Sequence, residues 1–187
     1  MHKLLLKSFV GAAILLIFNS FAFATGPASV YKVRVSKFEL NNGTSWITAF
    51  EGTSSALDIA SVSSGASAGS FMSGLSVPDG TYTQVRVTPS PTFVISGRDG
   101  VNYTTATAGP GGGSTFGTAG QQAEFTLTLA GGNVPGASTT DFSATPITVK
   151  DGVANHKIRV SFDVSNAIDT QGGELWPAQP TVTMSVQ

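Results

Sequence analysis

Residues 75–87 read Leu-Ser-Val-Pro-Asp-Gly-Thr-Tyr-Thr-Gln-Val-Arg-Val, a turn signal followed directly by an alternating strand. Pro78 presets the backbone of the first turn position, and Gly80 supplies the positive φ that other residues avoid. After Gly80, polar and apolar side chains alternate, which is the period of a strand with one buried face. This stretch therefore predicts a chain reversal that leads into an antiparallel strand.

Residues 31–40, which precede this turn in the sequence, show a similar alternation of polar and apolar side chains. Tyr31, Val33 and Val35 share one face of a predicted strand, and residues 38–40 carry the apolar side onward with a shifted phase. A β-bulge or bend near residues 36–37 accounts for the shift, because one extra residue reverses the face that each side chain occupies.

Residues 53–70 are mostly Ser, Ala and Gly and predict a loop or a short weak helix. Elsewhere, turn residues separate the predicted strands. The predicted strands are 46–50 after an Asn41-Asn42-Gly43 turn, a hairpin of 92–96 and 101–107 around residues 97–100, 125–129, 147–149 leading through Asp151-Gly152 into a long strand at 158–164, and 182–186. About eight or nine short strands with turns between them predict an all-β fold, an antiparallel β-sandwich of prealbumin-like or Ig-like type.

The run from Leu75 to Val87, with Pro78, Gly80 and Tyr82, resembles the Leu-x-Pro-x-Gly-x-Tyr signature of prealbumin-like (transthyretin-like) sandwich domains. The order of elements is also similar to a family of secreted bacterial proteins of unknown function with that fold. Shared features are the hairpin with Trp46, the Val-Ser-Phe-Asp-Val strand ending at Val164, and Trp176-Pro177. The resemblance implies a fold and an exported location; it implies no reaction and no catalytic residues.

The first 24 residues have the pattern of a cleaved secretory signal. His2, Lys3 and Lys7 precede an apolar run over residues 9–18, and Ala22-Phe23-Ala24 supplies a small-x-small cleavage pattern. The run is shorter than the roughly 20 apolar residues that span a bilayer as a helix. We therefore expect cleavage near Ala24, one domain over residues 25–187, no membrane anchor, and a secreted, periplasmic or cell-surface location in a bacterium.

Composition narrows the classes of partner. Charged residues make up 11% of the chain, and the net charge is −1, with no basic cluster. The low and scattered positive charge argues against nucleic acid as a partner, because nucleic-acid recognition requires clustered Lys and Arg. The chain has no cysteine, which excludes disulfides, thiolate metal sites and a lipoprotein anchor. A surface poor in charge opposes self-association weakly.

No constellation of residues predicts catalysis, a metal or a cofactor. His156 follows the Asp151-Gly152 turn without a nucleophile or an orienting group near it in sequence. Residues 108–120 are rich in glycine but lack the Gly-Lys-Ser/Thr ending of a phosphate-binding loop, so they predict a flexible surface loop or, if ordered, a contact between subunits. Each of three aspartates precedes a glycine, and the preference of this pair for turns explains their positions: Asp79, Asp99 and Asp151. A calcium site built by carboxylates from these separate loops is the alternative.

Two functions remain open. The first is an exported structural or adhesive surface protein, assembling with itself as an extracellular fibre or binding other cell-surface components. Strand addition by residues 25–35 (Tyr31, Val33 and Val35) is one route to such assembly, and pairing of that segment within its own sandwich is the alternative. The second function is a secreted or periplasmic module that binds carbohydrate or another small ligand. Its candidate stacking aromatics, which core packing would equally explain, are Trp46, Tyr82, Tyr103 and Trp176.

Overall fold

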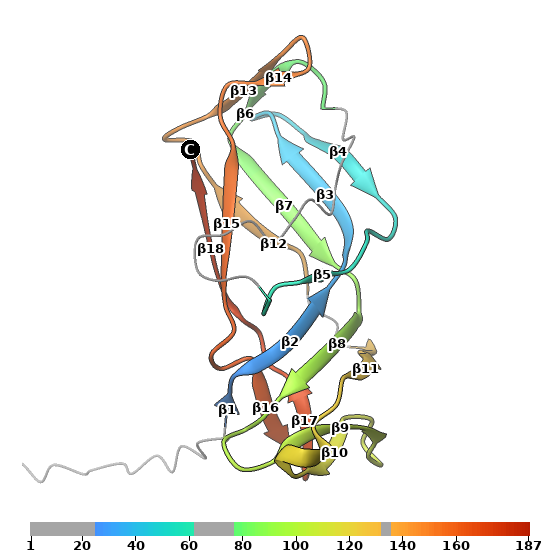
Figure 1. Ribbon diagram of the computed structural model, residues 1–187. Coiled ribbons are helices and arrows are strands. Elements are labelled where there is room, and N and C mark those ends of the chain that lie inside the picture. The colour runs from blue at the N-terminus through green and yellow to red at the C-terminus, as the bar shows by residue number, and fades with distance from the viewer. Residues whose placement is uncertain (1–24, 62–76, 132–135) are drawn as a thin grey trace, which may run out of the picture.

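The computed structural model describes residues 25–61, 77–131 and 136–187, and these residues form an all-β protein of several antiparallel sheets. Figure 1 shows an elongated molecule. A short 3-10 turn, η1 (Ala119–Gln121), is the one helical element within the described ranges. In that part of the chain, no helix has the length and hydropathy to cross a bilayer. The predicted signal segment and the residues between Val62 and Ser76 lie outside the described residues.

Two sheets build the lower end of the molecule in Figure 1. Their apolar faces share one core, in which Tyr31, Ile95, Ile168 and Leu175 are almost fully buried. The five-stranded sheet has the order β1 (Thr25–Gly26), β16 (Ile168–Gln171), β17 (Glu174–Pro177), β10 (Ser114–Gly117) and β9 (Tyr103–Ala108); the four-stranded sheet has the order β11 (Phe125–Thr128), β8 (Thr92–Gly97), β2 (Ala28–Val33) and β5 (Leu57–Asp58).

The upper end contains a second, smaller core of Leu40, Tyr82, Val85 and Val149. It lies against a four-stranded sheet and a three-stranded sheet. The first has the order β12 (Ser138–Asp141), β7 (Gln84–Pro89), β3 (Val35–Asn41) and β4 (Trp46–Glu51); the second has the order β14 (Val153–Ala154), β13 (Ile147–Lys150) and β6 (Gly80–Tyr82).

A two-stranded ribbon of β15 (Ile158–Asp163) and β18 (Thr181–Val186) runs along one side of the molecule (Figure 1). We call it the β15–β18 ribbon. Phe162 packs against the lower core, and Ile158 and Met184 pack against the upper one. The ribbon therefore connects the two halves through its apolar face.

The local turns and the bulge follow the sequence predictions. β2 ends at Val33, β3 begins at Val35, and the register of β3 against β7 shifts between Val35 and Lys37, where the apolar phase slips in the sequence. The Asn41-Asn42-Gly43 turn joins β3 to β4, with Gly43 at φ 90°. Gly80 is the exception: the prediction of a positive φ there is wrong, because Gly80 is already the first residue of β6. The bend at Asp79 leads into β6 and β7, and the Tyr82 hydroxyl donates a hydrogen bond to the Pro78 carbonyl over 2.8 Å.

The predicted number of eight or nine strands is wrong, because the described residues form eighteen strands. Long predicted strands break where the chain passes from one sheet to another. The alternating segment at residues 31–40 divides into β2, which pairs with β8 and β5, and β3, which pairs with β7 and β4. The strand predicted at 158–164 is confirmed as β15, and the additional short strand β14 precedes it. The hairpin predicted around residues 97–100 is likewise wrong: β8 pairs with β2 and β11, while β9 pairs with β10, and a single bridge joins Arg98 to Tyr103.

Candidate functional site

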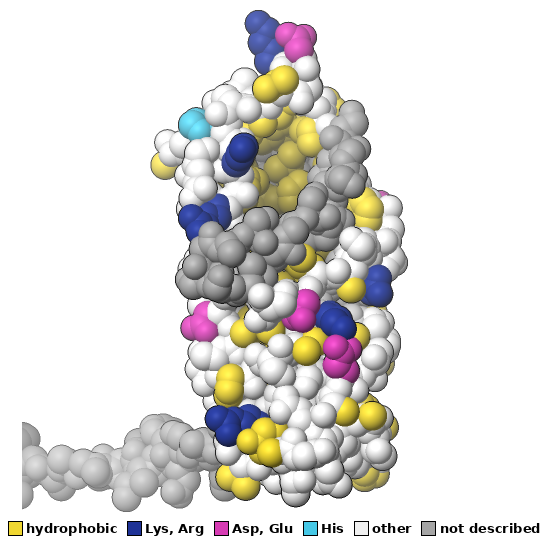
Figure 2. Space-filling model, in the orientation of Figure 1, with side chains coloured by type: hydrophobic (Ala, Val, Ile, Leu, Met, Phe, Trp, Pro, Cys, Tyr) yellow, Lys and Arg dark blue, Asp and Glu magenta, His cyan; other side chains and the backbone are white. Residues whose placement is uncertain are grey.

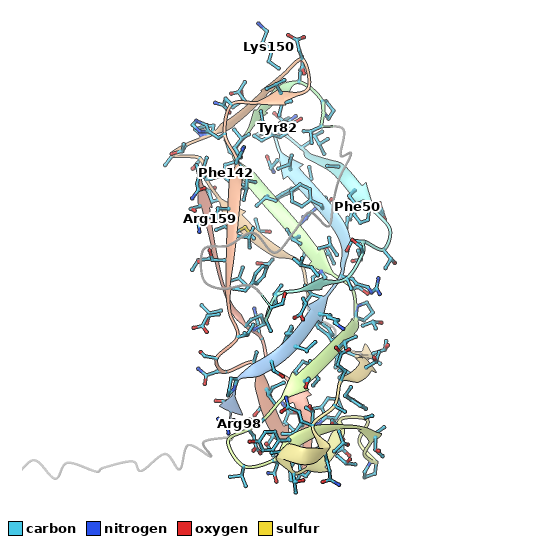
Figure 3. All side chains as sticks on the ribbon, in the orientation of Figure 1. Phe50, Tyr82, Arg98, Phe142, Lys150 and Arg159 are labelled. Atoms are coloured by element: carbon cyan, nitrogen blue, oxygen red, sulfur yellow. The ribbon has the colours of Figure 1, made fainter. Side chains whose placement is uncertain are left out.

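The four aromatic residues that the sequence singles out do not share one face. Tyr82 is 2% exposed and belongs to the upper core. The Arg86 guanidinium covers the ring of Trp46, 4.2 Å from its centroid. Arg98 lies 5.8 Å from the centroid of Tyr103, and Figure 3 shows Tyr82 and Arg98 at opposite ends of the molecule. The arrangement excludes one flat binding platform made of all four rings.

Arg86, which covers the Trp46 ring, also pairs with the buried carboxylate of Glu39. Two nitrogens of the guanidinium donate to the two carboxylate oxygens of Glu39, over 2.7 and 2.9 Å, and Lys37 lies 3.2 Å from the same group. The hydrogen bonds from Arg86 lower the pKa of Glu39, against the opposing effect of burial. The cluster has its charges paired, so it stabilises the sheet and does not form an open binding site.

Trp176 is the candidate aromatic that lines a pocket. The pocket has an open mouth and a volume of about 250 Å³, and its lining comes from the glycine-rich loop, the β16–β17 turn and β17. The lining residues are Pro110, Gly111, Gln171, Gly172, Glu174 and Trp176. The ring is half-buried, packed against the lower core on one side and the loop backbone on another.

Glu174 holds the glycine-rich loop in place. The residue is 4% exposed, and its two carboxylate oxygens accept hydrogen bonds from the backbone N–H groups of Gly111 and Gly113, each over 2.6 Å. The prediction of a flexible loop over residues 108–120 is therefore wrong: the segment contains β10 and η1 and is tied to β17. Sequence reasoning missed Glu174, because its partners lie more than 60 residues away and nothing adjacent to it signals them.

The β15–β18 ribbon has one apolar and one polar face. Directly opposed pairs on the apolar face are Ile158 with Val186, Val160 with Met184, and Phe162 with Val182. Val160 is 38% exposed and Val182 is 41% exposed, so the middle of this face is incompletely covered. Figure 2 shows hydrophobic side chains in a hollow of the upper half.

One edge of β15 faces away from β18, and no strand of the described residues pairs with it. Lys157 and Gln187 exchange both backbone hydrogen bonds, each over 2.9 Å. Hydrogen-bonded pairs alternate along an antiparallel ladder, so the N–H and C=O groups of Ile158, Val160 and Phe162 point away from β18. Within the described ranges, no other strand pairs with β15. This edge can therefore accept a further strand.

The predicted assembly strand over residues 25–35 pairs within its own sheets. β2, with Tyr31 and Val33, lies between β8 and β5, and β3, with Val35, lies between β7 and β4. Tyr31 is 2% exposed, and its hydroxyl donates to the Ala178 carbonyl over 2.9 Å. Assembly through this segment would require these pairs to break first.

The remaining candidates lie apart from the pocket and the ribbon edge. His156 is half-buried in the connection between β14 and β15. Asp99 accepts hydrogen bonds from the N–H groups of Val101 and Asn102, which is turn chemistry, and a further one from the distant Thr170 hydroxyl. Asp79 accepts a hydrogen bond from the N–H of Gly152, so the turns that contain Asp79 and Asp151 are joined across 73 residues. Among the residues that the structure describes, no three His, Cys, Asp or Glu side chains gather into a metal-binding group.

Comparisons with known proteins found no matching family model, no similar curated protein and no similar solved structure.

Proposed function

We propose that the protein is an exported structural or adhesive protein of the bacterial cell surface, and that copies associate through the open edge of β15. The observation that carries this proposal is the β15–β18 ribbon, which combines a partly exposed apolar face with an edge that no other strand of the described residues pairs with. Export rests on the signal pattern of the first 24 residues. The low proportion of charged residues, 11%, gives little repulsion between copies.

The edge of β15 fits a second copy of itself in one register. Two β15 strands can pair antiparallel about a two-fold axis, which is the commonest way in which identical subunits associate. With Ser161 opposite the Ser161 of the second copy, Val160 faces Phe162 on the apolar face. The outward backbone groups of Val160 and Phe162 are those that this register pairs, so the register agrees with the hydrogen bonding of the edge.

The other edge of the ribbon is less suited to a partner. One small cavity is lined by residues 140–142, which include the end of β12, by residues 184–186 of β18 and by Ile158 of β15, so β18 has a neighbour close by. The outward-pointing residues of β18 also lack charged neighbours on the same strand. For these reasons we assign the contact to β15.

The related proposal of a prealbumin-like sandwich has local support. The Tyr82 hydroxyl bonded to Pro78 closes the turn whose sequence resembles that family. The number and division of the strands differ from the simple sandwich that the resemblance implies. The family relationship therefore remains part of the proposal.

Engineered cysteines test the contact directly, because the chain has no cysteine of its own. In the proposed register, Ser161 forms a non-hydrogen-bonded pair with its copy, with Cα atoms about 4.5 Å apart, which a disulfide can bridge. Mild oxidation of residue 25–187 protein carrying Ser161→Cys should give a covalent dimer on a non-reducing gel. Thr183→Cys, on the same polar face but on β18, is the matched control and should stay monomeric.

A second pair of variants tests the apolar part of the contact. Val160→Lys should abolish association in light scattering, whereas Val182→Lys, at a similarly exposed valine on β18, should leave it intact. Electron microscopy of the same samples distinguishes dimers from fibres, since fibres need a second contact. Monomers at every concentration, or equal cross-linking of both cysteine variants, would overturn the proposal.

A further inference from the structure

The pocket beside Trp176 is formed by two rigid turns, and it is separate from the β15 edge. On one side, β16 and β17 are joined by Gly172 and Gly173, both with positive φ (60° and 82°), which allows the two-residue hairpin. On the other side lies the glycine-rich loop. Both elements belong to the five-stranded sheet or its connections, at the lower end in Figure 1.

The glycine-rich loop packs closely against Glu174 and Trp176. Glu174 fixes Gly111 and Gly113 through their N–H groups. A methyl group on Gly113 would lie 2.6 Å from Cε2 of the Trp176 ring, and one on Gly109 would collide with the Glu174 carboxylate. The absence of side chains at these positions lets the loop approach the ring, and the hydrogen bonds to Glu174 hold the pocket wall in place. A pre-ordered wall reduces the entropy that binding costs.

The chemistry of the lining favours a neutral ligand with both an apolar and a hydroxylated surface. The pocket offers the indole ring of Trp176, backbone groups of the loop and turn, and the side-chain amide of Gln171, whose nitrogen also donates a hydrogen bond to Asp169 over 3.1 Å. No Lys or Arg lines the pocket. Both oxygens of Glu174 are already bonded to the loop. An anion such as phosphate would therefore meet a carboxylate and no cation.

We infer that this pocket binds one pyranose ring of a carbohydrate. The C–H face of a pyranose packs on an aromatic ring, and its hydroxyls exchange hydrogen bonds with an amide. The volume of about 250 Å³ is below the roughly 300–1,000 Å³ of pockets for larger ligands, and its open mouth leaves room for a glycan to continue into solvent. The site would give the surface protein a contact with glycans, whether or not copies pair through β15.

Tryptophan emission provides a readout specific to this pocket, because Trp46 and Trp176 are the two tryptophans of the chain. Trp46→Phe protein emits from Trp176, and Trp176→Phe protein emits from Trp46. Methyl β-glucoside, methyl β-galactoside and N-acetylglucosamine are titrated at millimolar concentrations into both variants. At least one sugar should change the emission of Trp46→Phe protein and leave that of Trp176→Phe protein unchanged.

The Gln171→Ala substitution, added to Trp46→Phe, tests the amide and leaves the core untouched, because Gln171 is exposed. Loss of its hydrogen bond should weaken the binding constant by about 3- to 10-fold. Choline chloride is titrated in parallel as a cationic probe. No response to any of the sugars, a response to choline alone, or binding that is unaffected by Gln171→Ala would overturn the inference.

Discussion

The backbone N–H of Gly113 donates a hydrogen bond to Oε2 of Glu174 over 2.6 Å, across a separation of 61 residues. A charged acceptor makes such a bond shorter and stronger than a neutral one. It fixes a segment that has few apolar anchors of its own, and it brings the loop against Trp176. The order of the loop therefore comes from β17 and not from the loop's own composition.

Glu174→Gln should destabilise the protein by about 1–3 kcal/mol, because an amide group has one oxygen to replace two bonded carboxylate oxygens and leaves a buried N–H without an acceptor. Urea unfolding followed by circular dichroism measures the loss. Glu124→Gln is the control, since Glu124 is half-exposed and pairs with Lys32 at the surface; its cost should be at most about 1 kcal/mol. Equal effects of the two substitutions would contradict the role given to Glu174.

Gly113→Ala should cost about 1–3 kcal/mol, because the added methyl group would lie 2.6 Å from the Trp176 ring and 2.9 Å from Glu174. The emission of Trp176 should also shift as the ring is displaced. Gly120→Ala is the matched control in the same loop, since nothing lies within 4 Å of the position of its methyl group. That substitution should change the unfolding free energy by less than about 0.5 kcal/mol.

Local turn chemistry could be predicted from the sequence because its causes are adjacent residues. Gly43 and Gly152 take positive φ in the turns where the sequence places them, and Asp151 joins them at φ 51°. After Val35, the apolar side chains change from odd-numbered to even-numbered positions. This change in the sequence marks the place where the register of β3 against β7 shifts. Each of these features depends on a few consecutive side chains.

Sheet membership could not be predicted, because it depends on partners far along the chain. The turn around Asp99 has good hairpin chemistry, but β9 leaves β8 to pair with β10. Thr104, fully buried, accepts a hydrogen bond from the Gly97 N–H and donates to the Ala123 carbonyl, and so fixes that departure. For the pocket, Trp176 could be named from the sequence, whereas Glu174 and Gln171 required the structure.

Removal of residues 25–35 should prevent folding, and Tyr31→Ala should cost about 3–5 kcal/mol. β2 is an inner strand of its sheet, and Tyr31 packs edge-on against Phe93, with ring centroids 6.1 Å apart. The truncated protein should show no cooperative urea transition by circular dichroism. If it still folds cooperatively, the segment is free for exchange between copies, and the placement of assembly at β15 would need revision.

The free energy of unfolding should fall below about pH 4, partly because Asp99 takes up a proton. Burial alone would raise the pKa of this carboxyl, but hydrogen bonds from Thr170, Asn102 and Val101 outweigh it and lower the pKa from 3.8 to about 2. A carboxyl whose pKa is lower in the folded state stabilises that state above its unfolded pKa, and this contribution disappears as the pH falls through the folded pKa. One pKa unit corresponds to about 1.4 kcal/mol, so the loss from Asp99 is at most about 2–3 kcal/mol.

The Asp99→Asn variant isolates this contribution. An amide keeps an acceptor for the turn but cannot titrate, and its interaction with the Thr170 hydroxyl, 2.6 Å away, loses the charge. The variant should be less stable than the parent protein near pH 6, and the difference should shrink between about pH 4 and pH 2. Urea unfolding at intervals across this range measures it. A difference that stays constant with pH would show that Asp99 acts through packing and not through its charge.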